Sequence, residues 1–370
     1  MKLLVTSLSL LLFLESSFAA EPIILGQSAA LSGPASMLGT EMARGMNAYF
    51  NQVNEHGGIK GRAIKLITLD DGYEPDRTTK NTEKLIHDEK VVALVGFVGT
   101  PTSIAALNVA KGTTIPFIGA YTGADTLRDG KFDHVFNIRA SYNDEALRIA
   151  KEIDGMGLYK MGIVYQNDAF GQAGLRAMQA AMAKHPNLKL AWTEAVERNS
   201  INVTAAAAKI ASEHIDSVFV VSAYKTTGEL LTKARSAGYV GMVSTLSFVG
   251  AEPLAQTAGA AAQGVLVSAV MPSPHSEPIV LSGEYRRLMA KSTSDPHYSY
   301  ASMEGFVAAK VTVEALKKID GNITPESIEN AMRSLQLDLG GFQIDFSKGS
   351  NTSSHWVEST MIGAGGKITR

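Results

Sequence analysis

Residues 91–110 read VVALVGFVGTPTSIAALNVA. The run 91–95 is short and apolar and predicts a buried strand, and the alanine-rich run 104–110 predicts a helix. The loop between them holds two glycines and three hydroxyl side chains. A strand that leads directly into a helix is the repeating unit of a parallel α/β sheet. This unit therefore predicts an α/β fold, provided that the flanking sequence repeats it.

The flanking sequence does repeat the alternation of strand-like and helix-like runs. A first series extends from a strand at 23–27 to one at 115–118, and a second starts near Ser141 and extends to a strand at 264–270. Pro272-Ser273-Pro274 then interrupts regular structure, because proline is disfavoured inside helices and strands. Helices are expected at 279–291, 303–317 and 325–334, and strands at 342–346 and 355–362. Two series of βα units predict two Rossmann-like, doubly wound lobes.

Composition narrows the function classes. The 370 residues include 34 Lys and Arg against 36 Asp and Glu, a formal net charge of −2, so there is no electrostatic footprint for nucleic acid or for an anionic membrane. The hydrophobic content of 45% is ordinary for a globular protein. The chain has no cysteine, which excludes disulfides, thiolate nucleophiles, iron–sulfur clusters and a lipidated N-terminal cysteine.

The N-terminus resembles an export signal. Lys2 precedes an apolar run at 3–14, and Ser17-Phe18-Ala19 forms a cleavage site with small residues at positions −3 and −1. A buried helix or a membrane anchor is the alternative, but the run is short for a bilayer. Residues 1–19 are therefore predicted to be a signal peptide, with a mature chain that begins at Ala20 and is free in the periplasm.

A search for catalytic groups finds none. The eight histidines are scattered without an HExxH pair, and the chain has no G-x-S-x-G elbow, no Walker A motif and no complete dinucleotide fingerprint. Asp70-Asp71 follows a strand, where neighbouring side chains point to opposite faces, so a turn or cap role is expected rather than a shared-proton pair. The sequence predicts no enzyme activity, no metal and no cofactor.

Two neighbouring loops carry the chemistry of an anion site. Thr100, Thr102 and Ser103 surround a helix start at the carboxyl end of a strand, where open α/β sheets bind ligands. The first N–H groups of that helix lack partners within the helix and carry its positive dipole end. The next strand is followed by Gly119-Ala120-Tyr121-Thr122-Gly123, with the same chemistry. Ordinary N-caps are the alternative for one loop, but two such loops favour a carboxylate site.

The second series places aromatic residues at strand ends. Phe170 follows one strand, Tyr224 the next, and Ser247-Phe248 a third. Such residues could cover an apolar ligand in a cleft, although a single aromatic is more often a packed core residue.

The chain resembles the leucine/isoleucine/valine-binding type of periplasmic solute-binding protein, which serves ABC importers. The resemblance covers nearly the whole mature chain and rests on LSGP at 31–34, NEHGGIKGR at 54–62, DD at 70–71, YQNDAFG at 165–171 and ARSAG at 234–238. It implies the type I periplasmic binding protein fold, with three hinge crossings near Ser141, Met271 and Asp345. The implied lobes are 20–141 plus 272–345 and 142–271 plus 346–370.

The resemblance also implies a set of ligand contacts. A hydroxyl of the first loop, a backbone group and a hydroxyl of the second loop hold the ligand carboxylate, and apolar and aromatic side chains from both lobes surround the rest. The implied ligand-binding residues are Leu38, Thr100, Ala120, Tyr121, Thr122, Phe170, Tyr224, Ser247 and Phe248.

Two departures from the family pattern concern specificity and stability. The acid that pairs with an α-ammonium in amino-acid binders falls near Ser247, where no acid stands; Asp168 and Glu252 are the candidate replacements. Tyr73 and Gly99 occupy the positions of the family's disulfide cysteines. Either another acid reaches the site, or the ligand has no ammonium.

The leading hypothesis is a monomeric, non-enzymatic periplasmic receptor that delivers a small carboxylate-bearing solute to an inner-membrane ABC permease. The solute is a hydrophobic amino acid, or alternatively an aromatic or other organic acid without an amine. A sensor for a separate signalling partner is a second class, which neighbouring kinase rather than permease genes would favour. A dehydrogenase-like enzyme is disfavoured by the missing glycine fingerprint.

Overall fold

The computed structural model describes residues 20–276, 278–292 and 296–369. The signal peptide predicted at 1–19 lies outside these residues. The strands are β1 (Ala20–Ala29), β2 (Arg62–Asp70), β3 (Ala93–Val95), β4 (Phe117–Ile118), β5 (Val135–Phe136), β6 (Lys160–Gln166), β7 (Lys189–Val196), β8 (Ser217–Val221), β9 (Met242–Thr245), β10 (Val265–Ala269), β11 (Gln336–Asp338), β12 (Gln343–Asp345), β13 (Glu358–Ile362) and β14 (Ile368–Thr369).

The α-helices alternate with the strands through most of the chain. They are α1 (Ser36–Glu55), α2 (Pro75–His87), α3 (Thr100–Ala110), α4 (Tyr142–Gly155), α5 (Ala169–Ala183), α6 (Thr204–Ser212), α7 (Tyr224–Ser236), α8 (Ala251–Ala258), α9 (Val280–Ser292), α10 (Tyr300–Lys317) and α11 (Pro325–Arg333).

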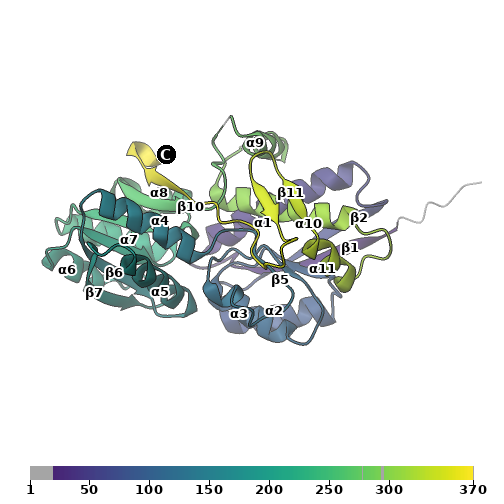
Figure 1. The fold of residues 1–370 in the computed structure, drawn as a ribbon, viewed down its shortest axis with the longest axis horizontal. Helices are drawn as coiled ribbons and strands as arrows, with labels where there is room; N and C mark the ends of the chain where they lie inside the picture. The colour runs from purple at the N-terminus through teal and green to yellow at the C-terminus, as the bar shows by residue number, and fades with distance from the viewer. Residues whose placement is uncertain (1–19, 277, 293–295, 370) are drawn as a thin grey trace, which may run out of the picture.

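Two parallel sheets form the centres of two bodies that lie side by side (Figure 1). The first sheet has the order β2-β1-β3-β4-β5 and is parallel throughout. The second has the order β14-β13-β10-β9-β8-β6-β7, in which β6 to β10 are parallel and β13 and β14 are added antiparallel. We call the body around the first sheet lobe one and the other lobe two. The predicted fold class, two doubly wound α/β lobes, is confirmed.

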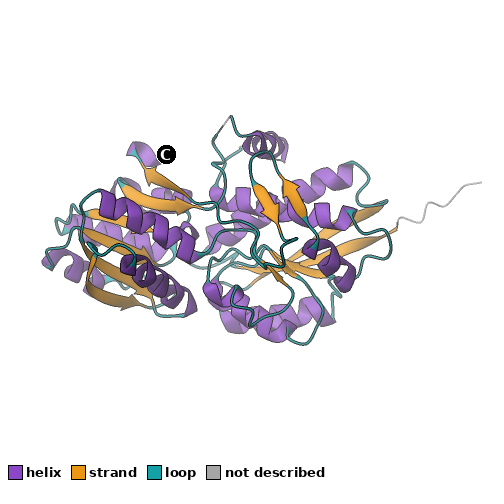
Figure 2. Cartoon of the chain, viewed as in Figure 1, coloured by secondary structure: helices purple, strands orange, loops and turns teal. Residues whose placement is uncertain are grey.

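Helices cover both sheets and bury their apolar faces on them (Figure 2). In lobe one, α1 packs along α10, and α2 packs on α3. In lobe two, α4 packs on α5, and α6, α7 and α8 pack in succession. One large core runs through both lobes, and a smaller one, with Phe97 and Phe117 at its centre, fills the space near α3. No helix among the described residues is long and apolar enough to cross a bilayer.

Three segments connect the two lobes. They are residues 137–141 after β5, 270–279 after β10 and 346–357 after β12. The first and third run side by side, because Asn137 N–H donates to the Asn351 carbonyl and Ser353 N–H donates to the Asn137 carbonyl. The crossing points predicted near Ser141 and Met271 fall in these segments, and Asp345 directly precedes the third.

Most predicted elements occur; helices such as α3 and α10 start earlier than predicted, whereas the strands β3, β4, β10, β12 and β13 are shorter than predicted. The sequence reading missed β5, β11 and β14, which have only two or three residues, and α8, a short helix with a proline in its first turn. Helix α3 begins four residues before its predicted start at 104, because Pro101 is tolerated in a first turn. The turn role expected for Asp70-Asp71 is confirmed: Asp70 accepts from the backbone of Leu31, and Asp71 from that of Tyr73.

Candidate functional site

The predicted site residues stand at equivalent places in the two lobes. Both parallel sheets have the strand order second-first-third-fourth-fifth, so each reverses direction next to its first strand. Ligands of doubly wound sheets bind at the carboxyl ends of strands near such a switch point. Thr100 follows β3 and Thr122 follows β4 in lobe one, and Phe170 and Tyr224 follow β6 and β8 in lobe two. The switch points thus bring the two sets of loops to the junction of the lobes.

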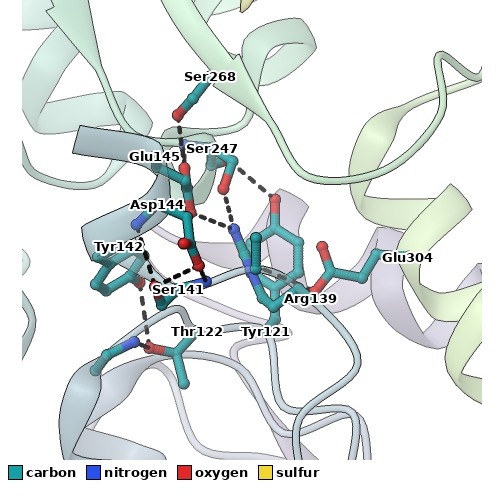
Figure 3. A network of polar contacts seen from close by, with 12 residues as sticks. Tyr121, Thr122, Arg139, Ser141, Tyr142, Asp144, Glu145, Ser247, Ser268 and Glu304 are labelled. Atoms are coloured by element: carbon teal, nitrogen blue, oxygen red, sulfur yellow. Dashed lines mark hydrogen bonds and ion pairs between the residues drawn. The ribbon is translucent and has the colours of Figure 1, made fainter. Parts of the chain in front are cut away.

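The two threonines that were expected to hold a carboxylate lie together. Their hydroxyl oxygens are 2.7 Å apart, and both side chains are fully buried. Thr122 Oγ1 donates to the hydroxyl of Tyr142, the first residue of α4, at 3.2 Å, and burial raises the pKa of that tyrosine to about 12. Thr100 and Thr122, which are far apart in the chain, therefore form one polar group. Tyr142 is its third member, and Figure 3 shows its contact with Thr122.

The hydroxyls in the first turn of α3 are not N-caps. Gly99 is the N-cap residue, with φ 100°, so it has no side chain to satisfy the first N–H groups. Thr102 Oγ1 instead donates back to the Val98 carbonyl at 2.5 Å. The buried Ser103 Oγ has no hydrogen-bond partner in the described part of the chain. The ordinary-cap alternative is therefore wrong for this helix.

Ala120 enters the site through its backbone alone. Its carbonyl accepts a hydrogen bond from Thr122 N–H at 2.8 Å, which closes a tight turn. Its side chain packs in the smaller core with Phe117 and Leu127, away from the aromatic residues described next.

Aromatic rings from both lobes fill the centre of the junction. Phe170 and Phe248 of lobe two have ring centroids 4.4 Å apart, and Phe248 also lies 5.7 Å from Tyr121 and 5.8 Å from Tyr73, both of lobe one. Phe170 lies 5.7 Å from Tyr142. The predicted residues Tyr121, Phe170 and Phe248 thus meet in one aromatic cluster, which contains Tyr73 and Tyr142 as members that the sequence reading missed.

Tyr224 and Leu38 meet at another part of the junction. The Tyr224 hydroxyl accepts a hydrogen bond from Met37 N–H at 3.2 Å, so it reaches from lobe two to the start of α1. Leu38, the next residue, is fully buried and lies against the loop at Gly250. The structure describes a conformation in which the lobes are in contact at these residues.

A buried ionic cluster surrounds Ser247 (Figure 3). Arg139, in the first connecting segment, donates to Ser247 Oγ, lies 3.3 Å from a Glu145 oxygen and 3.5 Å from a Glu304 oxygen, and covers the Tyr121 ring at 4.9 Å. Glu145 accepts from Ser247 N–H at 2.8 Å and from Ser268 Oγ at 2.5 Å. Three parts of the chain therefore place charged groups at the position where the sequence offered only a serine.

The three charged groups are not equally satisfied. Glu145 has hydrogen-bond donors on both oxygens, whereas Glu304 makes no hydrogen bond with the described residues. Burial raises the pKa of the Glu304 carboxyl to about 7; Arg139 opposes this shift and Glu145 reinforces it. Glu304 is thus a carboxylate in a poorly solvated position without donors of its own.

Neither acid suggested as a replacement at Ser247 takes that role. Asp168 is the N-cap of α5 and accepts from Phe170 N–H and Gly171 N–H. Glu252 accepts from Tyr300 N–H at 3.2 Å and lies 3.4 Å from His275. Local partners hold Asp168 and Glu252 Oε1, whereas the buried Glu252 Oε2 has no hydrogen-bond partner among the described residues. The acids in contact with the Ser247 cluster are Glu145 and, across Arg139, Glu304.

The two residues at the family's disulfide positions contact each other. The Tyr73 ring lies against Gly99, so closely that any side chain at position 99 would overlap it. The Tyr73 side chain is fully buried and its ring faces Phe248. Packing of an aromatic ring on a glycine thus joins the segments that a disulfide would join.

A small cavity with room for about one water-sized group lies beside the ionic cluster. Its polar lining comes from Tyr121, Ser247, Ser268, Tyr300 and Glu304, and its apolar lining from the end of β10 and from Ala251. Thr100 and Thr122 do not line it in this conformation, because Tyr121 and the other aromatic rings occupy the junction. In this conformation the cavity is too small for a whole solute and suits a single water-sized group.

Signals for the missed residues were present in the sequence. Arg139 and Glu145 flank the crossing predicted at Ser141, and Glu304 is an acid within an otherwise apolar helical run. Their mutual contact depends on three separate segments, so local patterns could not reveal it. Within the described ranges, no group of three or more metal-ligating side chains occurs.

Comparisons with known proteins agree with this geometry. A family model described as periplasmic binding protein matches residues 22–366. The chain is 22% identical to Leu/Ile/Val-binding protein homolog 7 of Brucella abortus, over 93% of this chain and 91% of that protein. A possible leucine/isoleucine/valine-binding protein from Rhodopirellula baltica has a solved structure with TM-score 0.89, 32% identity and coverage of 95% and 96%.

A substrate-binding periplasmic protein from Ralstonia solanacearum is similar in structure, with TM-score 0.88, 29% identity and coverage of 94% of this chain and 99% of that one. The family match spans nearly all of the described chain, and the fold and the strand-end loops agree with it. The chain belongs to the periplasmic binding protein family.

Proposed function

We propose that this protein is the periplasmic substrate-binding component of an ABC transporter and captures a small carboxylate-bearing solute between its lobes. The observation that carries the proposal is the contact between Thr100, at the start of α3, and Thr122. Their hydroxyl oxygens lie 2.7 Å apart. A helix start without a side-chain cap offers N–H groups to an anion. The orphan hydroxyl of Ser103 adds a donor to the same turn.

The rest of the junction supports an apolar ligand body. Phe248 contacts both Tyr121 and Phe170 in this conformation. When the lobes separate, these rings part and expose apolar surface on both sides. A solute whose apolar group replaces the ring contacts would allow the lobes to close again, which is a common mechanism of ligand capture in clefts.

A hydrophobic amino acid is the preferred solute, and an organic acid without an amine is the second candidate. The fold accommodates both kinds of ligand: a Thermus thermophilus protein of TM-score 0.84 and 20% identity was solved with bound valine, and an R. palustris protein of TM-score 0.82 and 19% identity with benzoate. Arg139 beside Ser247 favours an organic acid without an amine, whereas the neighbouring carboxylates of Glu145 and Glu304 favour an amino acid.

A thermal-shift panel of amino acids, aromatic acids and short organic acids tests the proposal. A ligand at 100 times its Kd should stabilise the protein by about 2.7 kcal/mol. No shift with any carboxylate would contradict the proposed function. The periplasmic location and the permease partner follow from the family and from the predicted signal, and monomeric state stays a prediction.

Substitution of the threonine pair gives the first prediction. Thr100→Val and Thr122→Val should each weaken binding of the best panel ligand about 10- to 100-fold, because a hydrogen bond to a charged group contributes roughly 1.5–3 kcal/mol. Thr232→Val, at an exposed threonine of α7, is the matched control and should bind normally. Unchanged affinity in both site variants, measured by calorimetry, would remove the carboxylate from this position.

A further inference from the structure

The ionic cluster at Ser247 has one guanidinium and two carboxylates that both pair with it, and only one of the carboxylates also accepts hydrogen bonds. Glu145 is fully buried and is held by Ser247 N–H, Ser268 Oγ and Arg139. Arg139 is shared among Ser247, Glu145, Glu304 and the Tyr121 ring. Its hydrogen bonds go to Ser247 and Glu145, and it contacts Glu304 as an ion pair alone.

Glu304 differs from Glu145 in its hydrogen bonding and in its position beside the cavity. Its carboxylate lacks hydrogen-bond donors among the described residues, and it lies 3.5 Å from Arg139 Nη1 at a geometry that forms no hydrogen bond. It lines the small cavity, whereas Arg139 does not. A ligand group of about the size of a water molecule in this cavity thus meets a carboxylate and residues that carry hydroxyls.

We propose that Glu304 is the specificity-determining acid of this site and that it binds a primary ammonium group of the solute, which is therefore a zwitterion. The proposal rests on the proposed function, in which the threonine pair takes the carboxylate. A buried carboxylate without donors is costly, and a cation in contact with it offsets that cost. Glu304, from α10 of lobe one, thus supplies the acid that is missing at Ser247 of lobe two.

The side chains that line the cavity favour a cationic ligand group over an anionic one. An anion would approach Glu304 directly, and like charges in a poorly solvated site repel. The remaining polar lining consists of hydroxyl groups of Tyr121, Ser247, Ser268 and Tyr300, which accept hydrogen bonds from an ammonium as readily as they donate. An ammonium with three N–H donors can therefore contact Glu304 and neighbouring oxygens together.

The proposal gives a pH dependence as a second readout. Charged groups that face Glu304 are Arg139 and Arg128, which lower its pKa, and Glu145, which raises it; Tyr121 packs beside them. Because the pKa of free Glu304 is about 7, the carboxyl is mostly protonated at pH 6 and ionised at pH 8. Affinity for an ammonium-bearing ligand should therefore rise from about pH 6 to about pH 8, with proton release, and affinity for an amine-free acid should not.

Calorimetry with matched pairs of ligands tests the assignment. Leucine is compared with 4-methylpentanoate, and 6-aminohexanoate with hexanoate, which brackets two spacings of carboxylate and ammonium. In the unmodified protein, at least one amine-bearing member should bind about 10- to 100-fold more tightly than its amine-free partner. Glu304→Gln should abolish that preference and leave affinity for the amine-free acid unchanged.

Glu314→Gln is the matched control, because Glu314 is on the same helix and pairs with Lys317 at the surface. It should keep the preference. If Glu304→Gln fails to fold, the pH dependence of ligand affinity in the unmodified protein tests the assignment of Glu304. Equal or tighter binding of the amine-free acids, or a preference that survives Glu304→Gln, would overturn the assignment while leaving the carboxylate receptor intact. Absence of binding by all four probes and by the wider acid panel would instead overturn the proposed function.

Discussion

At the scale of single residues, the buried network around Arg139 determines the character of the lobe junction. Glu145→Ala should lower the free energy of unfolding by about 3–5 kcal/mol, because it leaves the Arg139 charge without its fixed partner. It also removes the acceptor of Ser247 N–H and Ser268 Oγ. Glu229→Ala, which breaks an exposed pair with Lys233, should cost about 0–1 kcal/mol. Urea denaturation of both variants measures the difference, and equal losses would show that the buried pair is not stabilising.

At the scale of elements, the crossing of α1 and α10 positions the walls of the cavity. The helices approach at two glycines: a Cβ on Gly45 would overlap the Ser302 carbonyl, and one on Gly305 would overlap the Met42 carbonyl. Gly45→Ala and Gly305→Ala should each destabilise the protein by about 1–3 kcal/mol, because added atoms must force the helices apart.

Helix α10 also carries Glu304, so both variants should weaken ligand binding as well. Gly155→Ala in α4 is the control, since nothing lies within 4 Å of its added Cβ. That variant should be neutral or more stable by about 0.4–1 kcal/mol. Thermal denaturation and calorimetry report the two effects, and a harmless Gly45→Ala would contradict the close approach.

At the scale of the whole molecule, polar contacts at the edge of the junction hold the lobes together. Glu74 of lobe one lies 2.9 Å from Arg198 and accepts from Asn199 at 2.7 Å, both of lobe two. Glu74→Gln should raise the ligand Kd up to about fivefold, because an exposed ion pair contributes about 0–1 kcal/mol to the closed form. The effect should shrink at high salt. Glu83→Gln, on the exposed side of α2, should have no effect.

Small-angle scattering checks the same prediction. Ligand should reduce the radius of gyration of the unmodified protein, and Glu74→Gln should need a higher ligand concentration for the same compaction. An unchanged radius of gyration on saturation would count against lobe closure as the capture mechanism.

The sequence by itself determined the α/β class, the two lobes, most helix and strand positions and the two threonine loops. These features depend on local periodicity and on residues that directly follow strands, and parallel strands bring their carboxyl ends to one edge. The contact of Thr100 with Thr122 followed from that rule, because β3 and β4 are neighbours in the sheet.

Only the tertiary structure decided which charged groups meet at Ser247. Arg139, Glu145 and Glu304 come from a connecting segment, the first turn of α4 and the middle of α10, and no sequence period links them. The sequence suggested Asp168 and Glu252 because they are near in the chain, but Asp168 caps α5 and one oxygen of Glu252 accepts from the Tyr300 N–H. Ion pairing depends on separation in space, and packing of α10 on α1 sets that separation for Glu304.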